Sequence, residues 1–190
     1  MYYTYVLLAI ILLSYAAQLL IPEYTQLLIF NPSNPNPWMI ITPIFLHGNL
    51  SHLFLNCFAL IMFAPYLEDA LGHKKFLLFF LAAGVAGNLL YWLTIMIGII
   101  PPIPALGASG SIYGVLGGLS VLMPQLVIFV FGFLPMKIKH ATVLWIVFEF
   151  INTFNPGSGI GSAAHLGGLI FGIVAMKIYI NKLKARIRYY

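Results

Sequence analysis

The sequence has few charged residues. Only 7% of its 190 residues are charged, where about 25% is typical of soluble proteins, and only four of them are acids. At the same time 62% are apolar, against roughly 45–50% in an average soluble protein. So few charges cannot cover a water-facing surface, which excludes a water-soluble domain and an intrinsically disordered chain. The solvent for most of the chain must therefore be lipid.

Cysteine is equally scarce. Cys57 is the only one, so no disulfide can form within the chain, and cysteine usage does not indicate a redox compartment. Cys57 lies in an apolar run, a position typical of a buried and unreactive thiol.

Basic residues outnumber acidic ones, and their positions predict the topology. The net charge of +5 does not indicate nucleic-acid binding, because the bases form no stripe. The nine bases fall in three clusters, at 74–75, 137–139 and 177–188. The positive-inside rule places all three clusters in the cytoplasm, so both termini should be cytoplasmic and loops one, three and five should lie outside. We expect a multi-pass protein of the plasma membrane.

Hydropathy predicts an all-α polytopic membrane protein with six transmembrane helices in one domain over residues 1–190. The proline-rich stretch around 23–37 cannot be a spanning helix and is predicted to be a long first loop. The apolar segment 125–135 is too short to span and is bracketed by prolines, so we interpret it as an interfacial or buried connector. The predicted helices are 3–21, 50–67 (or from 47), 76–97, 109–122, 140–153 and 163–180.

Polar residues of three predicted helices lie at a similar depth. Asn56 precedes Glu68, and His165 precedes Lys177, by twelve residues in each case. At 1.5 Å per residue, both lie roughly 18 Å above the cytoplasmic boundary. Ser109 begins its helix just after an external loop and so also lies toward the outer side. Polar groups are costly in lipid, so their convergence indicates a functional site.

The two predicted helices that carry Ser109 and His165 each contain a glycine repeat. Glycine recurs every fourth residue at 110, 114 and 118, and again at 168 and 172. Small residues at this spacing let two helix backbones approach closely. If the two seams face each other, Ser109 and His165 come within side-chain reach. The alternative is that the seams serve packing alone.

Ser109 and His165 together would support acyl transfer. A serine hydroxyl is a weak nucleophile and needs a base within hydrogen-bonding distance, which His165 can be. The Gly-Ala-Ser-Gly sequence at 107–110 is similar to the small-residue setting that exposes a nucleophilic serine. An oxyanion needs donors, which His52, Asn56 one turn further on, and the backbone N–H of Ser109 can supply. The alternative is that His52 and Asn56 satisfy each other or a loop carbonyl.

Acids are not expected at this site. Glu68 and Asp69 lie at the cytoplasmic side and Glu23 lies in the first loop. Glu149, near the outer end of the fifth helix, is the only candidate, and we interpret it as a structural or gating group. The sequence therefore predicts a Ser–His dyad.

Metal chemistry is the alternative to a serine nucleophile. Histidines occur five residues apart at 47 and 52, about 140° around a helix, and no His-Glu-x-x-His stretch is present. We therefore expect neither a metal nor a cofactor.

These residues together resemble the rhomboid intramembrane serine proteases. The resemblance is carried by Ser109 in its Gly-Ala-Ser-Gly setting, by His165 and the glycines after it, and by His47, His52 and Asn56 on the second helix. The junction at 68–76, with its glycine and basic pair, is similar to the turn between helices two and three of that family. The resemblance covers nearly the whole chain, as a minimal six-helix core.

The resemblance implies a function and a set of roles. Rhomboids cleave transmembrane substrates near the membrane surface without a cofactor, often after a small residue beside helix-destabilising ones. The expected partners are thus transmembrane proteins and the lipid bilayer, with no nucleic acid. The implied roles are nucleophile for Ser109, general base for His165, oxyanion hole for His52 and Asn56, and support for Tyr113, stacked on the histidine, and for His47.

Some features depart from the family or stay open. Many bacterial members carry Trp-Arg in loop one where this chain has Trp38 and Met39, and we expect neither a soluble N-terminal domain nor a seventh helix. Tyr113 could instead be an ordinary interhelical aromatic. The short fifth helix could swing outward to admit a substrate, with Phe148 or Phe150 packed against helix two. The sequence does not indicate the oligomeric state.

Two other functions stay open as well. A catalytically inactive relative that binds transmembrane segments would lack the Ser–His pair, which is present here. A transporter would show an inverted repeat or two broken helices in corresponding halves, and neither is evident.

Overall fold

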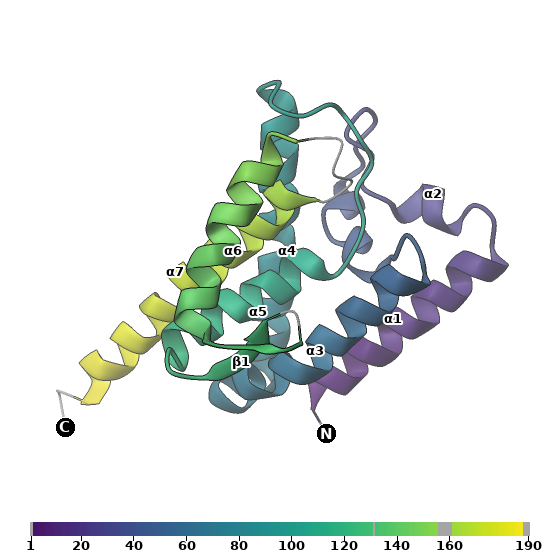
Figure 1. Ribbon diagram of the computed structural model, residues 1–190. Helices are drawn as coiled ribbons and strands as arrows, with labels where there is room; N and C mark the ends of the chain where they lie inside the picture. The colour runs from purple at the N-terminus through teal and green to yellow at the C-terminus, as the bar shows by residue number, and fades with distance from the viewer. Residues whose placement is uncertain (1, 131, 156–160, 188–190) are drawn as a thin grey trace.

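The computed structural model describes residues 2–130, 132–155 and 161–187, which form a bundle of helices (Figure 1). Two of the helices, α5 (Ser109–Leu122) and α6 (Ile138–Thr153), have only 14 and 16 residues, fewer than the roughly 20 that a bilayer requires. The prediction of a helical multi-pass membrane protein is confirmed at this level, while six spans stays a prediction. Among the described residues, four helices are long and apolar enough to cross a membrane: α1 (Tyr3–Leu20), α3 (Leu50–Leu71), α4 (His73–Met96) and α7 (Ser162–Ile187).

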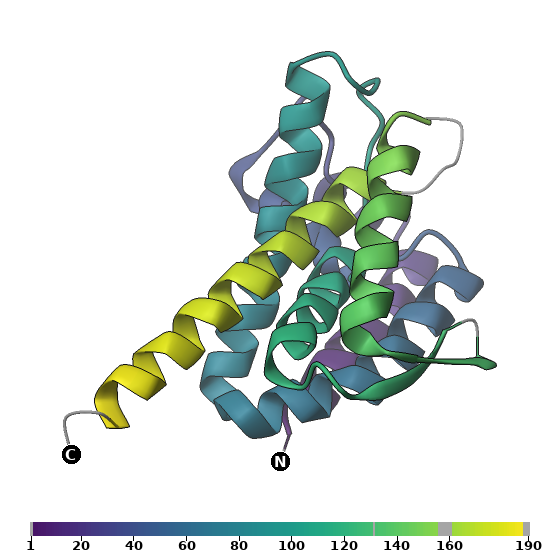
Figure 2. The same ribbon diagram turned by 60° about the vertical axis from the view of Figure 1, so that its left-hand side comes forward.

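Helix α5 lies at the centre of the bundle and packs against α3, α4 and α7; in Figure 2, α7 runs diagonally in front of α4. The two glycine seams face each other: a Cβ built at Gly168 would overlap the carbonyl of Gly110, and one built at Gly172 would overlap that of Gly114. Only glycine permits backbones to come this close. The predicted meeting of the seams is confirmed, and it brings the beginning of α5 against the first turns of α7.

A buried carboxylate fixes α1 to the end of α3. Glu68 accepts hydrogen bonds from the backbone N–H groups of Tyr3 (2.5 Å) and Thr4 (2.9 Å) and from the Thr4 hydroxyl (2.6 Å). His73 Nδ1 lies 2.6 Å from the same side chain. The first N–H groups of a helix have no acceptor within that helix. Glu68 of α3 supplies the acceptor and so caps the start of α1. The start of α1, the end of α3 and the start of α4 therefore lie together.

The lysines gather at this same end of the bundle. Lys75 of α4 places its ammonium group 5.4 Å from the ring centroid of Tyr179, near the end of α7. Figures 1 and 2 both show the start of α1 and the end of α7 at the lower end of the molecule. This arrangement agrees with termini on one common side, but the cytoplasmic side stays a prediction. The described lysines concerned are Lys74, Lys75, Lys137, Lys139, Lys177, Lys182 and Lys184, and Arg188 lies outside the described residues.

The connector between α5 and α6 contains a hairpin that the sequence did not predict. Strands β1 (Val127–Val130) and β2 (Leu134–Lys137) pair antiparallel. Pro124 and Pro135 prevent a helix here, the residues of β1 are β-branched or aromatic, and Gly132 takes φ 81° in the turn. The prolines excluded a helix in this segment. They do not specify the register in which two strands pair, so the hairpin could not be predicted from them.

Loop one is folded rather than irregular. The side-chain amide of Gln18 in α1 donates to the carbonyl of His47 (3.2 Å) and accepts from its N–H (2.9 Å). Phe30 and Ala105 form a two-residue bridge between loop one and the loop before α5. These contacts hold the residues before α3 close to the start of α5. The short helices of the loop are α2 (Tyr24–Leu28), η1 (Pro37–Ile40) and η2 (Thr42–Phe45).

Candidate active site

The site centres on Ser109 and His165, which come from different helices. Ser109 is the first residue of α5, and His165 lies in the first turn of α7. Ser109 Oγ lies 2.8 Å from His165 Nε2. The contact follows from the glycine seams, because a wider helix spacing would separate the two side chains. The structure thus brings together the two residues that the sequence singled out as nucleophile and base.

A carboxylate completes this arrangement, contrary to the prediction that no acid lies at the site. Glu149 Oε1 of α6 lies 3.0 Å from His165 Nδ1 and accepts a hydrogen bond from the hydroxyl of Tyr113 (2.6 Å). The Glu149 side chain is almost fully buried. Sequence spacing placed Glu149 near the outer end of its helix but gave no information about which face of α6 meets α7. That face is decided by helix packing.

Tyr113 lies where the resemblance placed it. Its ring stacks on the ring of His165 with 4.4 Å between centroids and 6° between planes, and Trp145 of α6 packs edge-on against it with 6.2 Å between centroids. The histidine is therefore held by a ring on its face, a carboxylate at Nδ1 and a hydroxyl at Nε2. Such an imidazole has little freedom to turn.

The ring of His52 lies close to Ser109 because the residue between them, Gly107, has no side chain. Gly107 takes φ 131°, which disfavours other residues, and a Cβ built there would lie 2.8 Å from the His52 ring and 3.6 Å from Ser109 Oγ. The imidazole and the hydroxyl thus flank the same backbone position. The backbone N–H of Ser109, at the start of α5, adds a donor at the positive end of a helix dipole.

Asn56 is buried, and its side-chain hydrogen bond is to its own helix rather than to Ser109 or His165. Its amide donates to the carbonyl of His52 on the same helix at 2.8 Å. This matches one alternative raised by the sequence, that the two residues satisfy each other. An asparagine amide carries two N–H donors, so the His52 carbonyl accounts for one of them.

His47 is buried beside His52, with 5.1 Å between ring centroids. Burial, and secondarily the neighbouring His52, lower the pKa of His47 to about 4. The residue is therefore neutral at neutral pH. Gln18, which brackets the backbone of His47, was not singled out by the sequence, because a single polar residue on a lipid-facing helix gives no signal of its partner.

A cavity of about 310 Å³ lies beside His52 and the start of α7, and among the described residues its lining contains neither Ser109 nor His165. Its lining combines polar groups with apolar ones, so it can admit water or an extended peptide segment. Within the described residues, histidine, cysteine and acidic side chains form no group of three that could hold a metal ion. Residues on the cavity wall include Gly48, His52, Tyr91, Pro104, Asn152 and Ser162.

Helix α6 forms one wall of the site, and its outer phenylalanines face away from the bundle. Phe148 and Phe150, considered as contacts to α3, are more than half exposed, and Phe150 packs instead on Phe154 with 5.3 Å between centroids. The glycine-rich loop after α6 falls largely in 156–160, outside the described residues.

Comparison with known proteins identifies the family. The sequence model described as "Rhomboid domain" matches residues 34–182. The chain is 30% identical over 154 residues to YdcA of Bacillus subtilis, covering 81% of this chain and 73% of that protein. It is 32% identical over 139 residues to rhomboid protease GluP of the same organism, covering 73% of this chain but 25% of GluP. Rhomboid protein 1, mitochondrial, of Saccharomyces cerevisiae is 31% identical over 137 residues, which cover 71% of this chain and 40% of that protein.

The matched region contains α3 to α6 and most of α7, and therefore Ser109, His165, Glu149, Tyr113 and the histidines and asparagine before and on α3, but not Gln18. Since the family match extends over well more than half of the sequence, this protein belongs to the rhomboid family of membrane proteins.

Proposed function

We propose that this protein is an intramembrane serine endopeptidase that cleaves transmembrane helices near the outer membrane face. The observation that carries the proposal is the 2.8 Å contact between Ser109 Oγ and His165 Nε2 inside a bundle of apolar helices. Membership of a family with members named as proteases supports it. We place the protein in the plasma membrane, although several relatives are named as mitochondrial.

The reaction begins with attack by Ser109. Its Oγ forms a bond to the carbonyl carbon of the scissile peptide while its proton passes to His165 Nε2. The carbonyl π electrons move onto oxygen, giving a tetrahedral oxyanion. The intermediate collapses by breaking the C–N bond, and the leaving amine takes the proton from His165. Water then attacks the acyl-enzyme with His165 again as base, releasing the acid product and restoring Ser109.

The oxyanion is stabilised by donors fixed in advance. His52 flanks Gly107 beside Ser109, and Asn56 and the Ser109 backbone N–H are the further donors in our assignment. Donors aimed at a developing charge in a water-poor site contribute more than they would in bulk water. The buried His47 supports His52 by a ring contact, with 5.1 Å between centroids.

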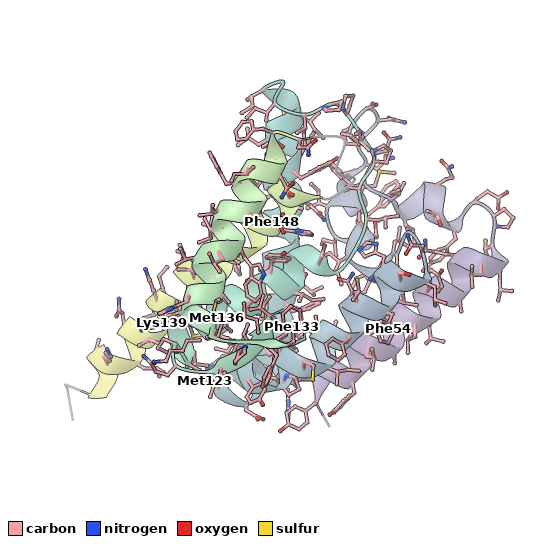
Figure 3. The ribbon with its side chains drawn as sticks, viewed as in Figure 1. Phe54, Met123, Phe133, Met136, Lys139 and Phe148 are labelled. Carbon is pink, nitrogen blue, oxygen red and sulfur yellow. The ribbon has the colours of Figure 1, made fainter. Side chains whose placement is uncertain are left out.

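A transmembrane substrate must reach Ser109 from the lipid. Figure 3 shows Phe148 on α6 and Phe54 on α3, with α5 between the two helices in this view. Both phenylalanines are more than half exposed. We place substrate entry between α3 and α6, and water access through the cavity beside His52.

The decisive experiment treats purified protein with a fluorophosphonate and locates the adduct by intact mass and peptide mapping. We expect one adduct, at Ser109, that is absent in Ser109→Ala and His165→Ala and unaffected by a zinc chelator. Ser111→Ala is the matched control, because this buried serine two residues further on points toward Gly84 and should not influence labelling. The same variants should parallel cleavage of a model transmembrane substrate.

The competing function is an inactive rhomboid-like module that binds transmembrane segments. A folded sample that gives no adduct and no cleavage would favour it. Cleavage that persists in Ser109→Ala would reject the serine mechanism altogether.

A further inference from the structure

Glu149 is a buried carboxylate that the reaction outlined above does not use. It is 1% exposed, and its Oε1 lies against both His165 Nδ1 and the Tyr113 hydroxyl. The three residues come from α6, α7 and α5 respectively, so the contact depends on three helices at once. A buried carboxylate is costly unless it is hydrogen bonded or paired. The contacts with His165 and Tyr113 both involve the histidine that we assign as the base or the ring stacked on it.

The contact determines which imidazole nitrogen carries the proton. A neutral imidazole has one N–H donor and one acceptor nitrogen. An ionised carboxylate can only accept, so a Glu149 carboxylate requires the proton of His165 to sit on Nδ1. Nε2 is then the acceptor that faces Ser109 Oγ, which is the arrangement a general base needs.

We propose that Glu149 is the positioning residue of a Ser–His–Glu triad, rather than a spectator beside a dyad. It acts through His165 by fixing the tautomer and by placing a negative charge beside the imidazolium that forms during attack. Tyr113 holds both partners, the histidine by its ring face and the carboxylate by its O–H. This inference rests on the proposed function, because a tautomer matters only if His165 is the base.

The first test needs no variant of Glu149. Wild-type protein is labelled with ¹⁵N-histidine, reconstituted in nanodiscs and measured by NMR at neutral pH, with His165 assigned as the signal missing from His165→Ala. We expect Nδ1 to be protonated and Nε2 not. The opposite tautomer would overturn the inference, whatever the variants do.

The second test compares substitutions at two positions. Glu149→Gln should lower kcat for a transmembrane substrate about 10²- to 10⁴-fold with KM nearly unchanged, and should increase the Nε2–H tautomer. Glu149→Asp keeps the carboxylate and should recover part of the rate. Tyr113→Phe keeps the stacked ring and loses only the donor to Glu149, so its loss should be smaller.

The outcomes separate this inference from the proposed function. Equal losses in Glu149→Gln and Glu149→Asp with an unchanged tautomer would show a merely structural role and overturn the inference, as would a wild-type rate in Glu149→Gln. Failure of wild-type Ser109 to react with a fluorophosphonate would instead overturn the proposed function, while the tautomer measurement would still report on the Glu149 contact.

A second feature, independent of the site, is one face of the β1–β2 hairpin. Ile128 is 6% exposed in the core, while its neighbours Val127 and Phe129 are 53% and 65% exposed. Their partners across the ladder, Lys137 and Pro135, are also exposed. Since strand side chains alternate, these four residues form one outer face, which we call the hairpin face: three apolar residues and one cation.

The hairpin face lies at the basic end of the molecule. The end of α5 that leads into it packs near Leu67 and Phe79, where α3 ends and α4 begins. Figure 3 shows Met123, Phe133, Met136 and Lys139 around the hairpin. The sequence of residues 123–140 includes two lysines and a histidine and no acid. The charge of this segment therefore complements an anionic surface.

Backbone and side chains together restrict the depth of the hairpin. A two-stranded ladder leaves an edge of each strand unpaired, which the hydrocarbon core does not tolerate. Exposed phenylalanine and valine are in turn unfavourable in water. The boundary between headgroups and acyl chains satisfies both, and lysines there meet anionic phosphates. We infer that the hairpin face rests in the headgroup layer of a leaflet containing anionic phospholipid.

The test measures depth with a spin label. A single cysteine at Phe129 in a Cys57→Ser background is labelled with a nitroxide, and its accessibility to oxygen and to a nickel chelate is measured in nanodiscs. Phe148→Cys, on the exposed side of α6, is the reference for a label in the lipid core. Lys184→Cys, near the end of α7, is the reference for a label in water. We expect the Phe129 label to lie between them and to move deeper when about a third of the lipid is phosphatidylglycerol.

Lys137→Gln combined with Lys139→Gln should abolish the dependence on anionic lipid while leaving the label shielded from nickel. Nickel accessibility equal to that at Lys184 would overturn the inference, because the hairpin face would then stand in water. A depth independent of phosphatidylglycerol in the chain with both lysines would overturn it equally.

Discussion

At the scale of single residues, the site depends on groups held by contacts from several helices. Ser109 and His165 meet at 2.8 Å, and the histidine ring is stacked on Tyr113. His52 reaches the same place only because Gly107 has no side chain. Substitutions here should therefore have graded effects, according to whether they remove a reacting group or one of several donors.

Loss of an oxyanion donor should slow the reaction without abolishing it. Asn56→Ala is expected to lower the cleavage rate about 10²- to 10³-fold, because one donor is lost while the nucleophile and base stay in place. The measurement is kcat/KM on a transmembrane substrate in proteoliposomes. Leu55→Ala, on the exposed side of the same helix, is the control and should cleave normally. An unchanged rate in Asn56→Ala would remove Asn56 from the oxyanion hole.

His47 should make the protein sensitive to acid. Because the folded-state pKa of about 4 lies below the ordinary value of 6.5, the unfolded chain binds the proton more readily. The free energy of unfolding should therefore fall as pH drops from about 6.5 to 4, by on the order of 2–3 kcal/mol. His47→Gln should flatten this part of the stability curve, measured by thermal unfolding in detergent. The exposed His140→Gln is the control, and equal curves for His47→Gln and wild type would refute the prediction.

At the scale of elements, the fold depends on two kinds of helix contact. Close backbone approach joins α5 to α7 through the glycine seams, and a buried carboxylate joins α1 to α3. The glycine contact is lost when a side chain is added at the seam. The carboxylate contact is lost when the charge or acceptor of Glu68 is removed, because the N–H donors at the start of α1 are then unpaired.

Added volume at the seam should separate α5 from α7. Gly168→Ala places a methyl group on the Gly110 carbonyl, so we expect loss of the folded state or of Ser109 labelling with a fluorophosphonate. Gly161→Ala is the matched control, since among the described residues its Cβ would meet only the Ala164 side chain, at 4.0 Å. A Gly168→Ala protein with wild-type melting temperature and labelling would contradict the observed packing.

Removal of the Glu68 charge should loosen α1. Glu68→Gln weakens the acceptor for Tyr3, Thr4 and His73, and we expect a loss of about 1–3 kcal/mol in the free energy of unfolding. Asp69→Asn, at the exposed neighbouring position, should change it by much less. Unfolding in sodium dodecyl sulfate titrations measures both. Equal effects of the two substitutions would show that burial of Glu68 is not what matters.

At the scale of the whole molecule, the described lysines and the active site lie at different levels of the bundle. The lysines cluster where α1 and α4 begin, and Ser109 lies at the far end of α5 from that cluster. Positive residues are retained on the cytoplasmic side of a membrane. The chemistry is therefore expected in the outer half of the bilayer.

Cysteine accessibility in a Cys57→Ser background should test this orientation. Asn34→Cys in loop one should react with an impermeant maleimide from outside intact cells, and Lys182→Cys in α7 should react only after permeabilisation. Both positions are exposed. The reverse pattern would invert the topology and place the proposed cleavage on the cytoplasmic side.

By itself, the sequence determined the lipid environment, the order of the helices, the start of α5 at Ser109 and the identity of the Ser–His pair. These follow from composition, proline positions and the cost of polar groups in lipid, which are local properties of the chain. The glycine repeats also indicated two helix faces that permit close approach, and the structure shows that these two faces meet.

Only the tertiary structure decided the features that depend on which side of one element faces another. Glu149 could be placed at a depth but not on a face, so its contact with His165 was missed. The β1–β2 hairpin depends on register between two segments, and the capping of α1 by Glu68 joins residues more than sixty positions apart. Rotation of a helix about its axis and pairing between distant segments are set by packing of the whole bundle, and no local pattern in this sequence encodes them.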